Sequence, residues 1–116
     1  MKNVIYKELN KEGFFYIEPY FFNNNGILIE IRTRTDGKSK IIDLSFIKVI
    51  NQRQGYGTKT MELLTNIADK YNYSIRLIIS SKFGVPKRVL RKFYKKFGFA
   101  SCSYDKDIFV REPKTK

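Results

Sequence analysis

Apolar and polar residues alternate over much of the first half of the chain. Isoleucines at alternate positions open the stretch Ile27–Arg34 and predict a strand with one buried face. The Asp-Gly pair within Thr35–Lys38 is typical of a hairpin turn, so Lys40–Val49 is expected to be the partner strand. The aromatic-rich stretch Phe14–Phe22 is also β-like, although Pro19 should break it or place it at an edge. Together these elements predict an antiparallel meander.

After Gly57 the apolar residues follow helical spacing. They predict a helix from about Thr58 to Tyr73, followed by a short buried strand over Ser74–Ser80. A second helix should begin near Pro86, a favoured first-turn residue, and be terminated by Gly98. The residues expected to face the core are Met61, Leu64, Ala68 and Tyr71 in the first helix and Val89, Leu90, Phe93 and Phe97 in the second.

The two ends of the chain carry shorter patterns. Asn3–Glu12 is polar and fits either a short strand or a helical turn, while Phe99–Tyr104 and Asp107–Arg111 predict two short closing strands. No internal repeat or linker is visible. Since 116 residues suit one compact core, we expect residues 1–116 to form a single domain.

Composition narrows the possible chemistry. The sequence has no histidine and only Cys102 as cysteine, which excludes His-based catalysis, an internal disulfide and His- or all-Cys metal cages, so no metal is expected. No apolar run reaches membrane-spanning length and no signal-peptide core is present, so we expect a cytoplasmic protein. The net charge is +12, and no acidic residue lies between Ser74 and Tyr104. This basic field favours an anionic partner, unless it is only a solvated face.

One stretch predicts where an anion binds. Gln52–Thr58 lies between the apolar run Ile41–Ile50 and the first predicted helix. A strand, a glycine turn and a helix in this order aim backbone N–H groups and the positive end of a helix dipole at one point. Gly55 and Gly57 let the main chain approach a phosphate without Cβ atoms in the way. A tight turn that caps the helix would use the same glycines.

Two motifs together resemble a known family. The first is Gln52-x-x-Gly55-x-Gly57, and the second is Phe93–Phe99, in which a tyrosine is followed by a glycine-phenylalanine pair. Their order, with a strand between them, resembles the GNAT superfamily of acetyl-CoA-dependent N-acetyltransferases over about residues 41–111. The resemblance implies an α+β (α/β layered) fold, with a mixed, mainly antiparallel central sheet flanked by helices. The N-terminal region before Ile27 is shortened relative to typical members.

The resemblance also implies how acetyl-CoA binds. Backbone amides of Gln54–Thr58 would bind its pyrophosphate, and main-chain groups of a strand that splays from its neighbour would bind its pantetheine arm. Lys87 stands where many relatives have an asparagine and could reach a CoA phosphate, as could Lys59. The cofactor-binding residues implied in this way are Ser45, Ile47, Gln52, Arg53, Gln54, Gly55, Tyr56, Gly57, Thr58 and Lys87.

Catalytic roles are implied for Tyr94 and Asp43. In the family, the tyrosine that matches Tyr94 protonates the departing CoA thiolate, whereas a core aromatic is the alternative reading. The glutamate that some relatives use as general base is replaced by Ile41, and Asp43 lies two residues further along the same strand face. Glu30 on the neighbouring strand is a second candidate base. Both carboxylates could instead form ion pairs across the hairpin, so the identity of the base stays open.

The resemblance implies transfer of an acetyl group from acetyl-CoA to a primary amine, by direct attack in a ternary complex. The shortened N-terminal region should leave the acceptor groove open, which suits a lysine of a protein or peptide better than an enclosed small amine. The alternative function is a non-catalytic, GNAT-like basic module that binds nucleic acid or an acidic protein through residues 74–96.

Overall fold

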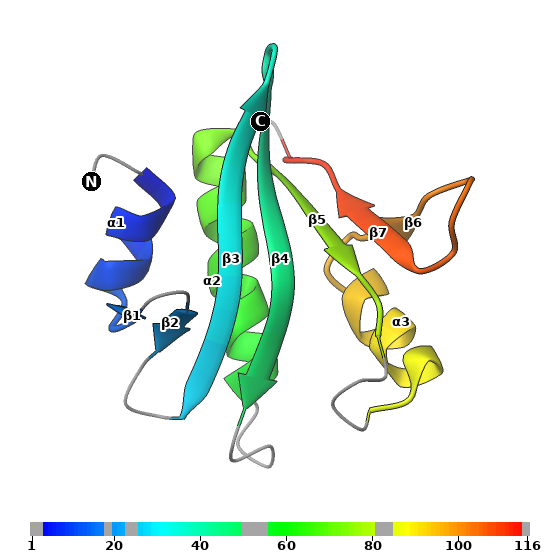
Figure 1. Cartoon of the computed structure of the whole chain (residues 1–116), viewed down its shortest axis with the longest axis horizontal. Helices are drawn as coiled ribbons and strands as arrows, with labels where there is room; N and C mark the ends of the chain where they lie inside the picture. Colours follow the sequence, from blue (N-terminus) through cyan, green and yellow to red (C-terminus); the bar gives the residue numbers. More distant parts are fainter. Residues whose placement is uncertain (1–3, 18–19, 23–25, 50–55, 81–84, 115–116) are drawn as a thin grey trace.

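The computed structural model describes residues 4–17, 20–22, 26–49, 56–80 and 85–114, whose strands form one seven-stranded sheet in the order β1-β2-β3-β4-β5-β7-β6 (Figure 1). All neighbouring strands are antiparallel except the parallel pair β4 and β5. This confirms the mixed, mainly antiparallel sheet flanked by helices. None of the helices in these ranges combines the length and apolar character needed to span a membrane. The elements are α1 (Val4–Lys11), β1 (Phe15–Ile17), β2 (Tyr20–Phe22), β3 (Ile27–Asp36), β4 (Ser39–Val49), α2 (Tyr56–Tyr71), β5 (Ser74–Ile78), α3 (Lys87–Lys95), β6 (Ala100–Ser101) and β7 (Ile108–Arg111).

Strands β3 and β4 form the long hairpin expected from the alternating residues. Their pairing runs from Ile27 opposite Val49 to Asp36 opposite Ser39. The loop between them holds Gly37 at φ +63°. Two-residue hairpin turns require a left-handed backbone, which glycine adopts without steric cost. The turn predicted from the Asp-Gly pair is thus confirmed.

The N-terminal region is a short helix followed by a two-stranded ribbon. The eight-residue helix α1 fully buries Ile5 and Leu9, which lie four residues apart on one helical face. Of the two forms that its sequence allowed, the helical one is therefore the one adopted. The aromatic stretch forms β1 and β2, which pair antiparallel. Pro19, which was expected to break this stretch or place it at an edge, comes between them in sequence and lies outside the described residues, and β1 is an edge strand of the sheet.

Helices α2 and α3 lie where helical spacing predicts them. Asn72, at φ +63°, directly follows the last residue of α2, whereas Gly98, at φ +91°, lies three residues after the last residue of α3. The predicted inward face of α3 was partly wrong. Val89 is 46% exposed, whereas Tyr94 is the buried residue of this helix. The helix is therefore rotated so that Tyr94 faces the core, and the partly buried residues beside it are Leu90, Phe93 and Phe97.

The two closing strands are shorter than the sequence pattern predicts. The backbone N–H of Cys102 donates to the carbonyl of Ile108 at 2.8 Å, and the N–H of Asp107 donates to the Asp105 carboxylate at 2.9 Å. These hydrogen bonds build a compact turn from residues that the pattern assigned to strand ends. The predicted strands over 99–104 and 107–111 are reduced in this way to β6 and β7.

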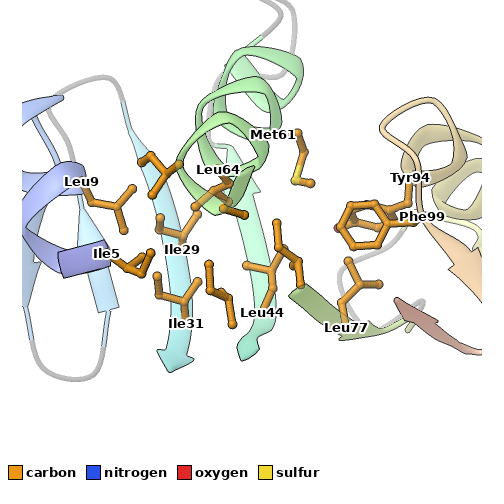
Figure 2. Close-up of a cluster of buried hydrophobic side chains, with 14 of the residues drawn as sticks. Ile5, Leu9, Ile29, Ile31, Leu44, Met61, Leu64, Leu77, Tyr94 and Phe99 are labelled. Carbon is orange, nitrogen blue, oxygen red and sulfur yellow. The ribbon is translucent and has the colours of Figure 1, made fainter. Parts of the chain in front are cut away.

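Buried hydrophobic side chains gather on one face of the sheet, here called the helix face. Ile29, Leu44 and Leu77 from three neighbouring strands pack there with side chains from α1, α2 and α3 (Figure 2). Helix α2 lies behind β3 and β4 in the view of Figure 1. A Cβ atom built on Gly57 of α2 would lie 3.9 Å from Cζ of Phe93 in α3, so these two helices are also neighbours. The three helices therefore cover the same face.

The opposite face of the sheet, here called the open face, carries polar side chains from the same strands. Asp43 of β4 is opposite Arg76 of β5, and Arg34 of β3 is opposite Ile41, two residues before Asp43. Residues in such positions project to the same side of a sheet. Ile78 also lies on this side and is 56% exposed. No helix of the described ranges packs on the open face.

A buried ion pair ties the last strand to the helices. Arg111 is only 3% exposed, and its Nη1 and Nη2 donate to the Asp69 carboxylate at 2.8 and 2.9 Å. Its Nε donates to the carbonyl of Phe97 at 2.7 Å. The hydrogen bonds from Arg111 lower the pKa of Asp69, because their effect exceeds the opposing effect of partial burial. This contact holds β7 against α2 and the end of α3.

Candidate active site

The parallel strands β4 and β5 separate part-way along their length. Their described pairing runs from Ile41 opposite Ser74 to Leu44 opposite Leu77, whereas β4 itself continues to Val49. A cavity of about 490 Å³ lies at this separation. It is lined by Arg34, Asp43, Leu44, Ser45, Arg76, Leu77, Ile78 and Ser80. A ligand at this point could reach main-chain groups that a continuous ladder would occupy.

A β-bulge in β4 coincides with the separation. The register with β3 shifts between Glu30 and Ile31, which leaves Ser45 as an extra residue without a partner there. A bulge bends a strand and increases its twist, which gives a physical reason for β4 to turn away from β5 after Leu44. Ser45, which is implied to bind pantetheine, thus lines the cavity at its opening. Ile47 lies two residues further along β4 and is paired with β3.

Helix α2 begins at Tyr56, at the end of the predicted anion-binding loop. Gly57, Thr58 and Lys59 lie in its first turn, and the last two are exposed. The first-turn N–H groups of a helix have no intrahelical acceptor, so this end presents donors and the positive end of the dipole. The remaining loop residues lie outside the described ranges, and their contacts stay predictions; they are Gln52, Arg53, Gln54 and Gly55.

Tyr94 lies on the helix face beside Leu77, which lines the cavity (Figure 2). Its ring packs edge-on against those of Phe93 and Phe99, at centroid distances of 5.2 and 5.6 Å. Burial raises the pKa of Tyr94 to about 12, so the phenol keeps its proton at neutral pH. Tyr94 is thus a core aromatic, which is the alternative that the sequence left open.

Asp43 lines the same cavity from the open face. Nε of Arg34 donates to Oδ2 at 2.7 Å, and Nη1 of Arg76 lies 3.7 Å from Oδ1. The ion pair expected across the hairpin is therefore present, and it joins Asp43 to Arg34 rather than to its register partner Arg32. Oδ1 is buried and accepts no hydrogen bond from the part of the chain that the structure describes. A buried oxygen without a hydrogen-bond donor is unfavourable, so a ligand that donated a hydrogen bond to Oδ1 would gain binding free energy from it.

The other candidate base lies further from the cavity. Glu30 is half-buried on β3, next to the register shift, and is not among the residues that line the cavity. Ile41, which replaces the family glutamate, is half-buried in the part of β4 that is still paired with β5. Of the two predicted catalytic residues, Asp43 therefore lines the cavity, whereas Tyr94 is buried on the opposite face of the sheet and is not among the described residues that line it.

Lys87 is held by an ion pair. Its Nζ donates to Oδ2 of Asp107 at 2.7 Å, and Nη2 of Arg91 donates to Oδ1 of the same carboxylate at 2.8 Å. These two hydrogen bonds, from Lys87 and then Arg91, lower the pKa of Asp107. A contact between Lys87 and a CoA phosphate would require its pair with Asp107 to open. The other basic residues of α3 and its C-terminal end are exposed; they are Arg88, Lys92, Lys95 and Lys96.

Two residues that line the cavity, Arg34 and Arg76, were not predicted from the sequence as site residues. A signal for Arg76 was present, because it lies between Ile75 and Leu77 in a short strand that is otherwise mainly apolar. A charged residue between two buried neighbours marks a strand whose second face meets solvent or a ligand. Arg34 gave less signal, since it follows other polar residues near the hairpin turn.

The candidate proton acceptor and the candidate proton donor lie on opposite faces of the sheet, and only Asp43 is among the described residues that line the cavity. Asp43 on the open face has a carboxylate oxygen without a donor, and Tyr94 on the helix face is a protonated phenol. Such a pair can take a proton from one reacting group and give a proton to another. Among the described residues, no cluster of three or more Cys, Asp or Glu side chains is arranged to hold a metal ion.

Comparisons with known proteins place this architecture in a recognised class. No protein-family model and no curated protein matches the chain. The anti-CRISPR protein AcrVA5 has a similar structure, with 14% identity over 83% of this chain and 93% of that chain and a TM-score of 0.55. Arabidopsis thaliana Naa50, solved with the bisubstrate analogue CoA-Ac-MVNAL, matches at 20% identity over 78% of this chain and 68% of that chain, with a TM-score of 0.58.

At these identities the likeness establishes the fold. The chain shares its fold with these two proteins, so the GNAT-like fold expected from its two motifs is confirmed at that level.

Proposed function

We propose that this chain is an acetyl-CoA-dependent N-acetyltransferase that transfers acetyl to a primary amine, a lysine of a protein or peptide. The observation that carries the proposal is the separation of β4 from β5 at the Ser45 bulge, with Tyr94 on one face and Asp43 on the other. The likeness in fold to Naa50, whose structure holds a bisubstrate analogue that contains CoA, supports it.

Acetyl-CoA would lie between the start of α2 and the separated part of β4. Its pyrophosphate would accept hydrogen bonds from main-chain amides of Gln54–Thr58, where the dipole of α2 favours negative charge. Its pantetheine arm would pair with main-chain groups of Ser45 and Ile47, which the described ladder between β4 and β5 does not reach. The thioester would then end at the cavity, between Tyr94 and Asp43.

The acceptor amine would attack from the open face in a ternary complex. Asp43 takes a proton from the ammonium, directly or through water, and the amine nitrogen then bonds to the thioester carbon. Since Arg34 binds Oδ2, Oδ1 is the oxygen that we assign to this step. Backbone N–H groups of β4 stabilise the oxyanion that forms.

Collapse of the intermediate breaks the carbon–sulfur bond. Tyr94 donates its phenolic proton to the departing thiolate, which leaves as CoA. Its raised pKa, about 12, keeps this proton in place until the thiolate develops. Asp43 then loses its proton to solvent, and Tyr94 regains one, which restores the site.

Calorimetric titration with acetyl-CoA, followed by an acetylation assay on a lysine-containing peptide, tests the proposal. We expect binding in the micromolar range that is lost in Gly57→Glu, because a carboxylate would project at the pyrophosphate. Transfer to polyamines or aminoglycosides but to no peptide would overturn the assignment of the acceptor. Absence of binding, together with salt-sensitive retention of DNA or RNA, would favour a binding module that uses the exposed cations of α3.

A further inference from the structure

Arg76 presents hydrogen-bond donors that the described protein does not use. It projects from the middle of β5 onto the open face, lines the cavity, and has a side chain that is 33% exposed. Its nearest acid is Asp43, but the separation of 3.7 Å between Nη1 and Oδ1 is too long for a hydrogen bond. An arginine carries five donors in a planar fork that matches a carboxylate with two parallel bonds. Arg76 is therefore placed as a receptor for a carboxylate.

The charges around the cavity also favour a ligand that carries a carboxylate. Asp43 is the only acidic residue among the described residues that line it, and it already pairs with Arg34 at 2.7 Å. Arg76 forms a second, longer ion pair with Asp43, so two arginines share one carboxylate among the described lining residues and one positive charge is left over. An acceptor that brought only an ammonium to Asp43 would be repelled by this guanidinium, whereas one that also brought an anion would be attracted.

We infer that the acceptor is an amine with a carboxylate close by, and that Arg76 binds this carboxylate. The inference rests on the proposed function and deepens it by naming the acceptor class. Asp43 and Arg76 are register partners on adjacent strands, so their main chains lie about 4.8 Å apart. The amine at Asp43 and the carboxylate at Arg76 are then held side by side. A peptide lysine next to a glutamate has this chemistry, as does a free amino acid with a second carboxylate.

Three peptides of one sequence test the inference, with Glu, Gln or Lys next to the acceptor lysine. We expect kcat/KM to be about tenfold higher for the Glu peptide than for the Gln peptide, and lowest for the Lys peptide. In Arg76→Gln the difference between the Glu and Gln peptides should fall to about twofold or less. Arg76→Lys should restore part of it, because it keeps the charge without the fork.

Arg32→Gln is the matched control. Arg32 lies on the open face as the register partner of Asp43, is exposed, and does not line the cavity. Arg32→Gln removes the same charge from the same face of the sheet. If this variant keeps the preference for the Glu peptide, the preference depends on the position of Arg76 and not only on the total positive charge of the face. Affinity for acetyl-CoA and the thermal unfolding midpoint of each variant report whether the site and the fold survive.

The outcomes separate this inference from the function on which it rests. If the peptides are acetylated at equal rates, or if Arg76→Gln keeps the preference, the inference is wrong while the acetyltransferase stands. If acetyl-CoA does not bind and no peptide is acetylated, the proposed function is wrong and the inference falls with it. A free amino dicarboxylic acid assayed in parallel identifies the source: Arg76-dependent acetylation of it but of no peptide would support the shared chemistry and assign a small molecule as acceptor.

Discussion

Replacement of Gly57 by alanine tests whether a ligand, rather than the fold, requires this glycine. Gly57 lies in the first turn of α2 and is not among the residues with positive φ, so its backbone conformation is open to any residue. A Cβ atom at this position would meet nothing closer than Cζ of Phe93 at 3.9 Å, an ordinary van der Waals distance. The described protein therefore has room for the methyl group.

The expected effects on stability and on binding have opposite signs. Alanine is favoured over glycine in helices by up to about 1 kcal/mol, so we expect Gly57→Ala to raise the free energy of unfolding by about 0.5–1 kcal/mol. For a chain of 116 residues this corresponds to a rise in Tm of roughly 2–4 °C. If a phosphate lies on the main chain here, the methyl group displaces it and weakens one or two charge-assisted hydrogen bonds. Affinity for acetyl-CoA should then fall about 10–100-fold.

Calorimetry with acetyl-CoA and thermal unfolding measure the two effects on the same samples. Asn66→Ala is the matched control, because Asn66 is an exposed residue of α2 whose replacement also raises helix propensity. It should stabilise the protein without a change in affinity. An affinity of Gly57→Ala within twofold of the wild type would refute contact between this main chain and the cofactor. A loss of stability would refute the conclusion that the fold tolerates a side chain there.

Three further substitutions probe other contacts. Tyr94→Phe should lower kcat about 100-fold without a change in affinity for acetyl-CoA. Because the pKa of Tyr94 is raised, the pH–rate profile of the wild type should show no loss of kcat from deprotonation of Tyr94 below about pH 11. Asp69→Asn should lower the free energy of unfolding by about 2–3 kcal/mol at pH 7 in urea titrations, because Arg111 loses its bidentate partner. The pKa of Asp69 is lowered in the folded state, so its stabilising effect is complete above its usual pKa and is lost as pH falls through the pKa of the folded state. The difference in free energy of unfolding between the wild type and Asp69→Asn should therefore narrow below about pH 4. Gly98→Ala should cost about 1–2 kcal/mol in the same titrations, because φ is +91° at this position and residues with a side chain rarely adopt this conformation.

Local patterns were enough to predict most of the fold. The hairpin of β3 and β4 carries its own signals, since alternating isoleucines define its buried face and an Asp-Gly pair defines its turn. Helix α1 was ambiguous because its eight residues contain only one buried pair, Ile5 and Leu9, at helical spacing. So short a helix depends on packing rather than propensity. Packing against the sheet also decides that Tyr94, and not Val89, is the buried residue of α3.

The bulge at Ser45 could not be predicted from local sequence. Serine is common at many kinds of position, and an extra residue in one strand appears only when its register against the partner strand is known. Alternation would carry the face of Asp43 straight through Ser45, but the bulge interrupts that alternation. The ion pair of Asp43 shows the same limit. Its direct partner in the register is Arg32, yet the hydrogen bond is made with Arg34, one position further along the same face.

The proposed cofactor site could be predicted from the sequence, whereas the proposed acceptor site could not, and this difference has a physical cause. A cofactor held by main-chain amides requires the absence of side chains, and glycines at fixed spacing record that requirement in the sequence, as in the loop that leads into Gly57. An acceptor held by side chains requires only that a carboxylate and a guanidinium meet on adjacent strands, and here Asp43 and Arg76 lie 33 residues apart in sequence but opposite one another in the sheet. Many pairs of residue types at many spacings could satisfy this requirement. Under the proposed function, substitutions at Arg76 or Arg34 would therefore change the choice of acceptor while the cofactor loop stays the same, so chains with this fold that share the loop need not share an acceptor.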